Sequence, residues 1–272
     1  MFWLHQLNRE NEFSKHWELV PAVTSELTEE AFRIRHNVYC AELGFEPANA
    51  EGRERDEYDE HSRHLLIRCM WTGAWAGCVR LVLRPEDRPE TLLPSERICG
   101  ATAIGELDGA FAPSCTNIAE ISRLALAREF RHARLAHHKA WITPSDLGAS
   151  AHAGALYLRL ALYLGAIAWA DRIGVEALLF LTEPRLAARL RKFGFPFKQV
   201  GTPVEHRGTR VLSLAHIDDP ILRLPFYMRP LYRAIESEID QGLEIQHAAP
   251  QAHHFPTRHA PIGMAHSHAM AA

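Results

Sequence analysis

Residues 116–127 read TNIAEISRLALA, an apolar run interrupted by Glu120, Ser122 and Arg123. A short aliphatic run of this kind is typical of a buried central strand. In a regular strand Glu120 and Arg123 point to opposite faces, whereas a β-bulge between them would bring both toward one cleft. An unpaired carboxylate in such a strand has a raised pKa, which suits a general base acting on an amine. The alternative is a salt bridge between Glu120 and a neighbouring arginine.

The segments around this strand predict a hairpin before it and a helix followed by a strand after it. Residues 64–70 and 75–83 are apolar runs joined at Thr72-Gly73, which is a hairpin signal. The strongly apolar run 154–172 predicts a helix that ends near Gly174. The other expected elements are a helix at 25–44, a buried strand at 175–182, a helix at 183–192, strands at 193–200 and 210–217, and a helix near 227–240.

Residues 84–115 contain four prolines and are expected to be long and irregular. A loop of that length inside a compact domain is usually functional, and one such role is a lid over a substrate.

The order of these elements predicts a mixed α/β (α+β) sheet domain. We expect an N-terminal extension at 1–20, one domain at 21–246, and a His/Ala/Pro-rich disordered tail at 247–272, where the composition shifts.

Composition excludes several classes of protein. The 272 residues carry 30 Lys plus Arg against 33 Asp plus Glu, a formal net charge of −3, so a dedicated nucleic-acid binder is not expected. Five scattered cysteines without a Cys-x-x-Cys pair favour reduced thiols in the cytoplasm. The most apolar window, 155–170, contains Arg159 and is shorter than the roughly 20 residues of a membrane-spanning helix. Dinucleotide, phosphate-loop and Gly-x-Ser-x-Gly motifs are absent.

A first group of candidate residues surrounds an arginine inside an apolar strand. Arg80 is flanked by aliphatic residues, and a buried guanidinium requires a partner because an isolated buried charge is very costly. Asp56 and Asp59 are natural partners, and Arg35 is a further possible member. The group fits either a structural ion-pair network or a polar site that holds an amine and a carboxylate.

Two further groups follow the central strand. The basic stretch 128–139 holds Arg128, Arg131, Arg134 and Lys139 and fits either a phosphate site or a solvated basic face. The apolar residues of the helix and the next strand are either simple core or the wall of an acyl-chain pocket. They include Leu156, Leu160, Leu164, Leu178, Phe180 and Leu181.

Eight positions in order resemble the acyl-homoserine-lactone synthase family: Arg35-x-x-x-Tyr39, Phe45, Asp56-x-x-Asp59, Arg80 and the Glu120-x-x-Arg123 pair. The family typically has Trp at the position of Phe45. The N-acyl amino acid synthases are more similar, and the acyltransferases associated with PEP-CTERM/exosortase systems are most similar. The strings VYCAELGFE, DEYDEHSRHLLIR, GCVRLVLRP and AEISRLAL carry this last resemblance, which covers roughly residues 30–200.

The resemblance implies a GNAT-like acyl-CoA N-acyltransferase fold over 21–246, with a mixed central sheet flanked by helices and splayed at the fourth strand. It implies transfer of a fatty acyl group from acyl carrier protein to the amine of an amino acid or similar small acceptor. The acyl-phosphopantetheine of the carrier protein, or acyl-CoA, is then the donor, with no permanently bound cofactor and no metal. We expect a cytoplasmic enzyme without a transmembrane segment and a membrane-active product.

The resemblance also implies roles for single residues. Glu120, directly or through water, takes a proton from the acceptor ammonium, and Arg123 and Arg80 position the acceptor, with Asp56 and Asp59 holding the arginines. Backbone amides near Ser122–Leu124 polarise the thioester carbonyl. The rest of the expected acceptor site is Arg35, Tyr39 and Phe45.

The donor site departs from the family pattern. The phosphate loop of the family is commonly Arg/Gln-x-x-Gly-x-Gly/Ala, and the matching string here is Arg131-His-Ala-Arg134-Leu-Ala136, with Arg in place of a Gly. This departure suits the phosphopantetheine arm of an acidic carrier protein, which Arg128, Arg131, Arg134 and Lys139 would attract.

Three alternatives remain open. They are an acetyl-CoA-dependent GNAT N-acetyltransferase, an acyl-homoserine-lactone synthase that uses S-adenosylmethionine, and a non-catalytic GNAT-shaped binding module. Phe45 in place of Trp and the long segment 84–115 argue against the second of these.

Overall fold

The computed structural model describes residues 13–85, 87–108, 117–132, 152–217 and 224–248. These residues form a seven-stranded sheet in the order β1-β2-β3-β4-β5-β7-β6. The strands are β1 (Trp17–Pro21), β2 (Ser62–Cys69), β3 (Trp75–Leu83), β4 (Ile118–Leu126), β5 (Ala177–Thr182), β6 (Lys198–Glu205) and β7 (Thr209–His216). Neighbouring strands are antiparallel except β4 and β5, which are parallel and therefore need a helical crossover between them.

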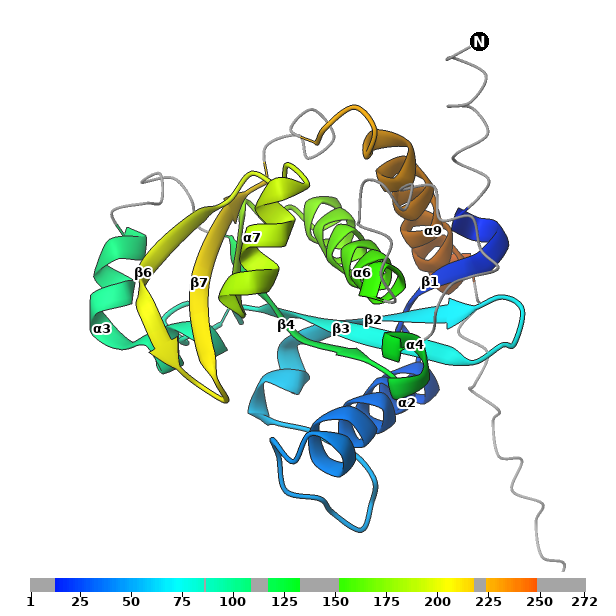
Figure 1. Ribbon diagram of the computed structural model, residues 1–272, viewed down its shortest axis with the longest axis horizontal. Helices are drawn as coiled ribbons and strands as arrows, with labels where there is room; N and C mark the ends of the chain where they lie inside the picture. Colours follow the sequence, from blue (N-terminus) through cyan, green and yellow to red (C-terminus); the bar gives the residue numbers. More distant parts are fainter. Residues whose placement is uncertain (1–12, 86, 109–116, 133–151, 218–223, 249–272) are drawn as a thin grey trace, which may run out of the picture.

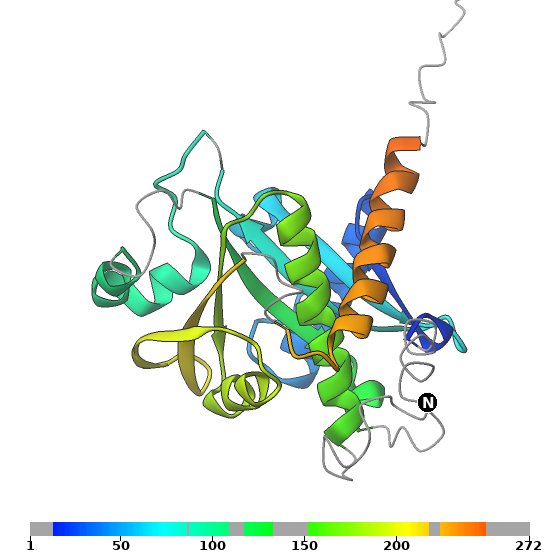
Figure 2. The same ribbon diagram turned by 90° about the horizontal axis from the view of Figure 1, so that it is seen from above.

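Helices cover both faces of the sheet (Figures 1 and 2). The crossover helix α6 (His152–Arg172) and the long helix α9 (Arg229–Ala248) pack on one face, where α7 (Pro184–Lys192) also lies. The other face is covered by α2 (Ser25–Arg35), which continues directly into the π-helix η1 (His36–Glu42), and by α3 (Pro94–Asp108). The short helices are η2 (Glu57–His61) and α4 (Arg128–His132).

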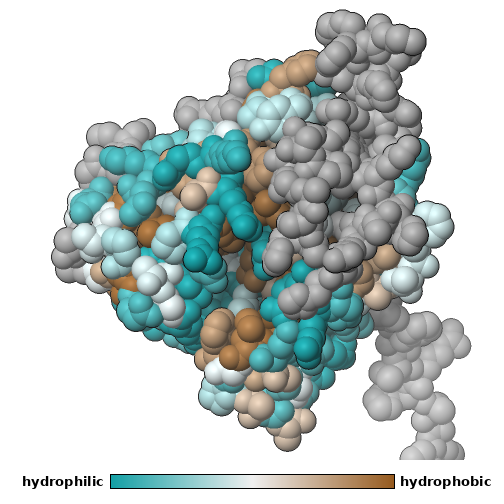
Figure 3. Space-filling model, viewed as in Figure 1, coloured by the Kyte–Doolittle hydropathy of each residue, from teal (hydrophilic) through white to brown (hydrophobic). Residues whose placement is uncertain are grey.

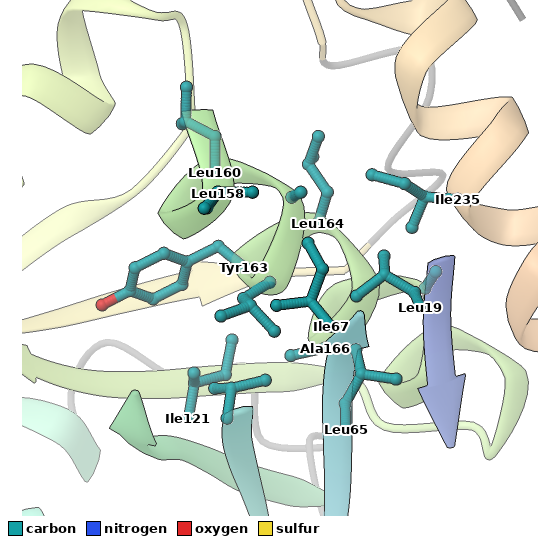
Figure 4. Close-up of a cluster of buried hydrophobic side chains, with 14 of the residues drawn as sticks. Leu19, Leu65, Ile67, Ile121, Leu158, Leu160, Tyr163, Leu164, Ala166 and Ile235 are labelled. Atoms are coloured by element: carbon teal, nitrogen blue, oxygen red, sulfur yellow. The ribbon is translucent and has the colours of Figure 1, made fainter. Parts of the chain in front are cut away.

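The main core lies between α6, α9 and the sheet. Leu158, Leu160 and Leu164 of α6 are fully buried and belong to one core cluster with aliphatic side chains of β1 and β2 (Figure 4). The sequence predicts this helix because it is apolar on every side, as expected for a helix enclosed by a sheet and a second helix.

Two irregularities of β4 open the sheet. Arg80 of β3 is opposite Ser122 and Cys78 is opposite Ala125, so one residue of β3 faces two of β4, which is a β-bulge. Arg123 within this bulge has a φ of 49°, which is rare for a residue other than glycine. On its other side β4 pairs with β5 only from Ile118 to Ile121, and beyond that point the two strands diverge. The predicted bulge and the predicted splay at the fourth strand are both confirmed.

The predicted secondary structure needs three corrections. Residues 94–108 of the segment expected to be irregular form α3, in which Pro94 occupies a helix start that tolerates proline. Leu107 of this helix and Leu93 just before it pack into a core cluster. The helix was missed because its pattern is broken at Gly100, whose φ of 74° kinks it.

The other two corrections concern strands. Trp17–Pro21, inside the expected N-terminal extension, is an edge strand that pairs with β2. The strand expected at 193–200 begins only at Lys198, because Gly194, with a φ of 83°, and Pro196 interrupt it. The helix at the carboxyl end extends to Ala248, and the tail beyond it lies outside the described residues.

Candidate active site

A cleft opens where β4 and β5 stop pairing. It has a volume of about 540 Å³ and lies between the bulged half of β4 and the end of β5 with the start of α7. Figure 3 shows this face of the molecule hollowed between hydrophilic rims, with hydrophobic residues visible inside the hollow. The splay of the sheet therefore creates this cleft.

The walls of this cleft are cationic. Six arginines and one acidic residue line it: Arg123, Arg131, Arg159, Arg185, Arg189, Arg210 and Glu183. The arginines come from β4, α4, α6, α7 and β7, so segments distant in the sequence build one surface. Several guanidinium groups that face one carboxylate create a positive potential, which attracts anionic ligands.

A second cavity, almost entirely apolar and of about 50 Å³, lies between the sheet and the helices α6 and α7. Three of the six residues expected to wall an acyl-chain pocket line it: Leu164, Leu178 and Phe180. Leu181 lines the cleft instead, and the remaining two, Leu156 and Leu160, are part of the core. Of the six residues, some therefore line a cavity or the cleft and the others only pack in the core.

Beneath the cleft, three arginines and four carboxylates form one network. Its members are Arg35, Arg80, Arg123, Glu46, Glu54, Asp56 and Asp59. Asp59 accepts hydrogen bonds from Nη1 and Nη2 of Arg35 at 2.6 and 3.0 Å and from Nη1 of Arg80 at 2.8 Å. Asp59 also accepts from the backbone amide of Asp56, which closes the capping box at the start of η2.

The buried half of this network is structural. Arg35 and Arg80 have no exposed surface, and carboxylates bind both. Arg123 differs, because its side chain is 18% exposed and lines the cleft while Glu54 and Asp56 bind its guanidinium at 3.1 and 2.9 Å. Of the three arginines, Arg123 is the one placed to contact a substrate, and the other two hold its partners.

The charges of the network reinforce one another. Burial raises the pKa of Asp59, but the hydrogen bonds and charge of Arg35 and the charge of Arg80 outweigh it and lower that pKa below its usual range. Burial lowers the pKa of Arg123, and the charges of Glu54 and Asp56 more than reverse that effect. Asp59 and Arg123 therefore stay ionised near neutral pH.

Glu120 lies on the same face of the sheet as Arg80 but is enclosed. Only 2% of its surface is exposed, and its Oε2 accepts a hydrogen bond from the backbone amide of Ser95 in α3 at 2.7 Å. Burial raises the pKa of Glu120 to about 7. Glu120 is not among the described residues that line the cleft, so a direct contact between Glu120 and an acceptor in the cleft is not supported.

Four other residues that the sequence predicts for the acceptor site also line the cleft. Tyr39, Phe45, Ser122 and Leu124 all line it. The Tyr39 hydroxyl donates to the carbonyl oxygen of Leu124 at 2.8 Å, and the Phe45 side chain is partly exposed. The π-helix η1 and the loop after it bring these two aromatic residues to the bulge in β4.

Only part of the basic stretch reaches the site. Arg131 of α4 lines the cleft and donates to Glu42 of η1, whereas Arg128 is absent from the described lining. The expected contributions of Arg134 and Lys139 fall outside the described residues.

Sequence reasoning missed most of the cationic lining. Arg159 sits in an apolar helix, a position that itself signals a special role. Arg185 and Arg189 of α7 are four residues apart and so share one helix face, but nothing in the sequence relates that face to β4. Glu54 bridges Arg35 and Arg123, but nothing in the sequence distinguishes it from the other acidic residues of its loop.

Other kinds of site find little support within the described ranges. No group of three or more His, Cys, Asp and Glu side chains there is arranged to hold a metal ion. None of the helices described is long and apolar enough to cross a membrane. Four of the five cysteines are free thiols, and Cys115 lies outside the described residues.

Residues 34–141 match the family described as acetyltransferase (GNAT) domain. An acyl-homoserine-lactone synthase of Agrobacterium fabrum is 26% identical over 172 residues, which span 63% of this chain and 69% of that protein.

Solved structures of similar fold include TofI, an N-acyl amino acid synthase and an acyl-homoserine lactone synthase. TofI, in a complex with an inhibitor and MTA, has a TM-score of 0.52 at 19% identity and covers 79% of this chain and 96% of its own. FeeM, an N-acyl amino acid synthase from uncultured soil microbes, has a TM-score of 0.50 at 13% identity, and the match covers 78% of this chain and 97% of FeeM. BjaI, a CoA-dependent acyl-homoserine lactone synthase solved with MTA, has a TM-score of 0.50 at 18% identity, and the match covers 83% of this chain and 89% of BjaI.

The splayed sheet, the cleft and the family match define this chain as an acyltransferase with the GNAT fold. Within that class its sequence is similar to an acyl-homoserine-lactone synthase, and its fold is similar to that of an N-acyl amino acid synthase.

Proposed function

We propose that this enzyme transfers a fatty acyl group from a phosphopantetheine thioester to the amine of an amino acid or a similar small acceptor. The observation that carries the proposal is the junction of a cationic cleft with an apolar cavity, which share Ile121 and Tyr163 as walls. A fatty acyl thioester has the matching halves, an anionic phosphopantetheine arm and an aliphatic chain.

The arginines of the cleft favour the phosphate of the donor. Arg159, Arg185 and Arg189 form no ion pair within 4 Å with the described part of the chain, so their charges are available to an anion. A carrier protein is acidic and would be attracted by the same field. We retain acyl carrier protein as the preferred donor, with acyl-CoA as the second.

The bulge in β4 is suited to the thioester carbonyl. Between Ser122 and Ala125 the pairing with β3 is interrupted, and beyond Ile121 there is no pairing with β5. Backbone amides in this short stretch therefore lack the usual strand partners on both sides. In our proposal they donate to the carbonyl oxygen as it becomes negative.

The acceptor occupies the end of the cleft near Tyr39 and Phe45, and Arg123 binds its carboxylate. Arg80, which is fully buried, acts only by holding Asp56 and Ser122 in place, the latter through a hydrogen bond from Nε to Oγ at 3.1 Å. Glu120 is the proton acceptor, and because it is buried, water must carry the proton to it. Ser122 marks the route of this water, because it lines the cleft and lies two residues after Glu120 on the same face of β4.

The test is a transfer assay with purified protein, a mixture of the protein amino acids and one donor at a time. The donors are hexadecanoyl carrier protein, hexadecanoyl-CoA and acetyl-CoA, and mass spectrometry detects the products. N-hexadecanoyl amino acids support the proposal, and the better of the two long-chain donors identifies the carrier. Transfer of acetyl groups alone would contradict it, as would the absence of any amide.

A second candidate is an acyl-homoserine-lactone synthase, which the match to the Agrobacterium protein favours. Replacing the amino acids by S-adenosylmethionine in the same assay separates the two. An acyl-homoserine lactone would identify the second function, and an N-acyl amino acid the first.

The finer assignment to the acyltransferases of PEP-CTERM/exosortase systems stays a prediction from the four strings quoted above. It predicts a gene neighbourhood that contains an exosortase, which inspection of the genome would test.

A further inference from the structure

A further large pocket lies away from the cleft, at the end of the sheet where the edge strand β1 stops. Its volume is about 650 Å³, within the roughly 300–1,000 Å³ of ligand pockets. β1 pairs with β2 only as far as Leu65, so the first residues of β2, Ser62–His64, extend beyond the described edge strand. The ends of α6 and α9 and the first turn of α2 also line the pocket. Among the described residues, its lining shares no member with the cleft or the apolar cavity.

The lining of this pocket carries charges of both signs beside an apolar wall. Arg63 and Arg172 are cationic, and Asp59 and Glu244 are anionic. The apolar wall consists of Val23, Trp169, Ile173 and Leu243. Because opposite charges in one pocket attract opposite ends of a ligand, this lining suits a small zwitterion with an apolar body.

Arg63 is the cation of this lining that is available to a ligand. Within the described ranges its guanidinium donates to the backbone oxygen of Ser62 at 3.4 Å and forms no ion pair. Arg172 differs, because Asp240 lies 3.4 Å from its Nε. A guanidinium group binds a carboxylate through strong, charge-assisted hydrogen bonds, so Arg63 is suited to the negative end of the ligand.

His64 supplies a buried acceptor for the positive end. The side chain is 3% exposed, and its ring packs edge to face against Phe32. No group in the described part of the chain forms a hydrogen bond with its Nε2, and Oδ1 of Asp59 lies 3.6 Å away, beyond hydrogen-bond distance. Burial and the charge of Arg35 lower the pKa of His64 to about 3, so the ring is neutral and one of its nitrogens accepts a hydrogen bond. Buried polar groups are normally hydrogen-bonded, and a ligand ammonium beside Asp59 would satisfy this one.

We infer that this pocket binds a free α-amino acid with an apolar side chain, at a second site separate from the acceptor end of the cleft. The ammonium donates to Nε2 of His64 beside Asp59, the carboxylate binds Arg63, and the side chain packs against Trp169. The charges and walls of the pocket carry this inference, so it does not depend on the proposed function. Asp59 also belongs to the ion network beneath the cleft, so that network touches both sites.

The test is a fluorescence titration without any acyl donor, with para-iodo-L-phenylalanine as the probe. Iodine quenches a tryptophan that it contacts. Trp169 is the one tryptophan in the described lining of this pocket, and the described linings of the cleft and the apolar cavity contain none. We expect saturable quenching that Trp169→Phe abolishes. Trp75→Phe, on β3 and outside the described lining, is the matched control and should keep the quenching.

Two analogues of the probe test whether both charges are recognised. para-Iodophenethylamine lacks the carboxylate and para-iodophenylpropanoate lacks the ammonium, and each is expected to bind about tenfold more weakly than the amino acid, because a hydrogen bond between charged groups is lost. Arg63→Ala should weaken binding of the amino acid about tenfold and leave that of the amine unchanged. His64→Leu should weaken the amino acid and the amine but not the propanoate. Arg68→Ala, on the same strand but outside the described lining, should change none of the three affinities.

Arg63 is exposed, so its replacement is expected to leave the fold intact, and urea unfolding checks this. An analogue that binds as tightly as the amino acid overturns the inference. The absence of quenching that depends on Trp169, or equal weakening of amino acid and amine in Arg63→Ala, overturns it as well. These results leave the proposed function intact because no acyl transfer is measured, and a failed transfer assay likewise leaves this binding site intact.

Discussion

Three guanidinium groups under the cleft share carboxylates, and Asp59 binds two of them, Arg35 and Arg80. Its two oxygens receive Arg35 in a bidentate arrangement and also Arg80, while 7% of its side chain is exposed. Such pairs are costly to bury and costly to break, because removal of one partner leaves the other charge uncompensated. The arrangement fixes Asp56 and Glu54, which in turn hold Arg123 at the edge of the cleft.

Asp59→Asn is therefore expected to lower the free energy of unfolding by about 3–5 kcal/mol, because Arg35 and Arg80 lose a buried anion. Urea unfolding measures the change. Glu57→Gln is the control in the same short helix, since Glu57 and its partner Arg97 are both more than half exposed and the pair is expected to contribute about 0–1 kcal/mol. A similar decrease in the free energy of unfolding in the two variants would show that the buried network contributes no more to stability than an exposed ion pair.

The buried carboxyl of Glu120 gives the second prediction at this scale. Burial raises its pKa to about 7, so Glu120 is protonated and unable to accept a proton at lower pH. The wild-type kcat/KM is therefore expected to rise through pH 7 and then to level. Glu120→Gln should lower the rate by a factor on the order of 100 or more and abolish that rise. A variant that keeps the wild-type profile would exclude Glu120 as the proton acceptor.

At the scale of elements, the close approach of β3 and β4 depends on Gly77. A Cβ atom at this position would lie 2.4 Å from the backbone oxygen of Ala125 and 2.6 Å from Cδ2 of Leu126. A backbone atom cannot rotate out of the way, so any side chain here must push the two strands apart. The contact lies next to the bulge that carries Arg123.

Gly77→Ala is expected to destabilise the fold by about 1–3 kcal/mol through overpacking. Thermal and urea unfolding measure it. Gly105→Ala in α3 is the control, because a Cβ atom there meets nothing within 4 Å and alanine favours a helix by up to about 1 kcal/mol. If Gly77→Ala is as stable as Gly105→Ala, the two strands tolerate separation.

At the scale of the whole molecule, the splay divides the sheet into two parts that meet again at the rim of the cleft. Glu46, in the loop after η1, binds Arg123 of β4 and also Arg207 in the turn between β6 and β7. Arg207 has a φ of 54°, and Gly208 after it has a φ of 91°, so a tight turn holds this arginine toward Glu46. One carboxylate thus connects the two parts across the opening.

The cationic surface of the cleft also belongs to this scale, because five elements contribute to it. Arg189→Glu on α7 is expected to raise the KM for hexadecanoyl carrier protein about tenfold at low salt, since it reverses one charge of the field. The effect should shrink at about 0.5 M salt, where charges are screened beyond a few ångströms.

Lys192→Glu makes the same change in net charge on the same helix but outside the described lining of the cleft, and it should have little effect. If the two variants behave alike, or if salt does not alter the difference between them, then net charge rather than the cleft governs donor binding.

Local patterns were sufficient for much of this architecture. The strand around Glu120, the hairpin at Gly73 and the helix that became α6 were predicted, because apolar periodicity and turn residues are local properties of the chain. The same holds for the partners of Arg80, since a buried guanidinium needs carboxylates and the acidic loop offered them. The helix α3 was missed where its pattern was weak.

Tertiary structure alone decided which side chains meet. Arg159, Arg189 and Arg210 are far apart in the chain and become neighbours only because β4 and β5 diverge and α7 lies beside the gap. Packing of α3 likewise encloses Glu120, which its strand would otherwise expose. The hydrophobic pattern of a segment indicates which of its faces is buried. Which other segment packs against that face depends on the contacts of the whole chain.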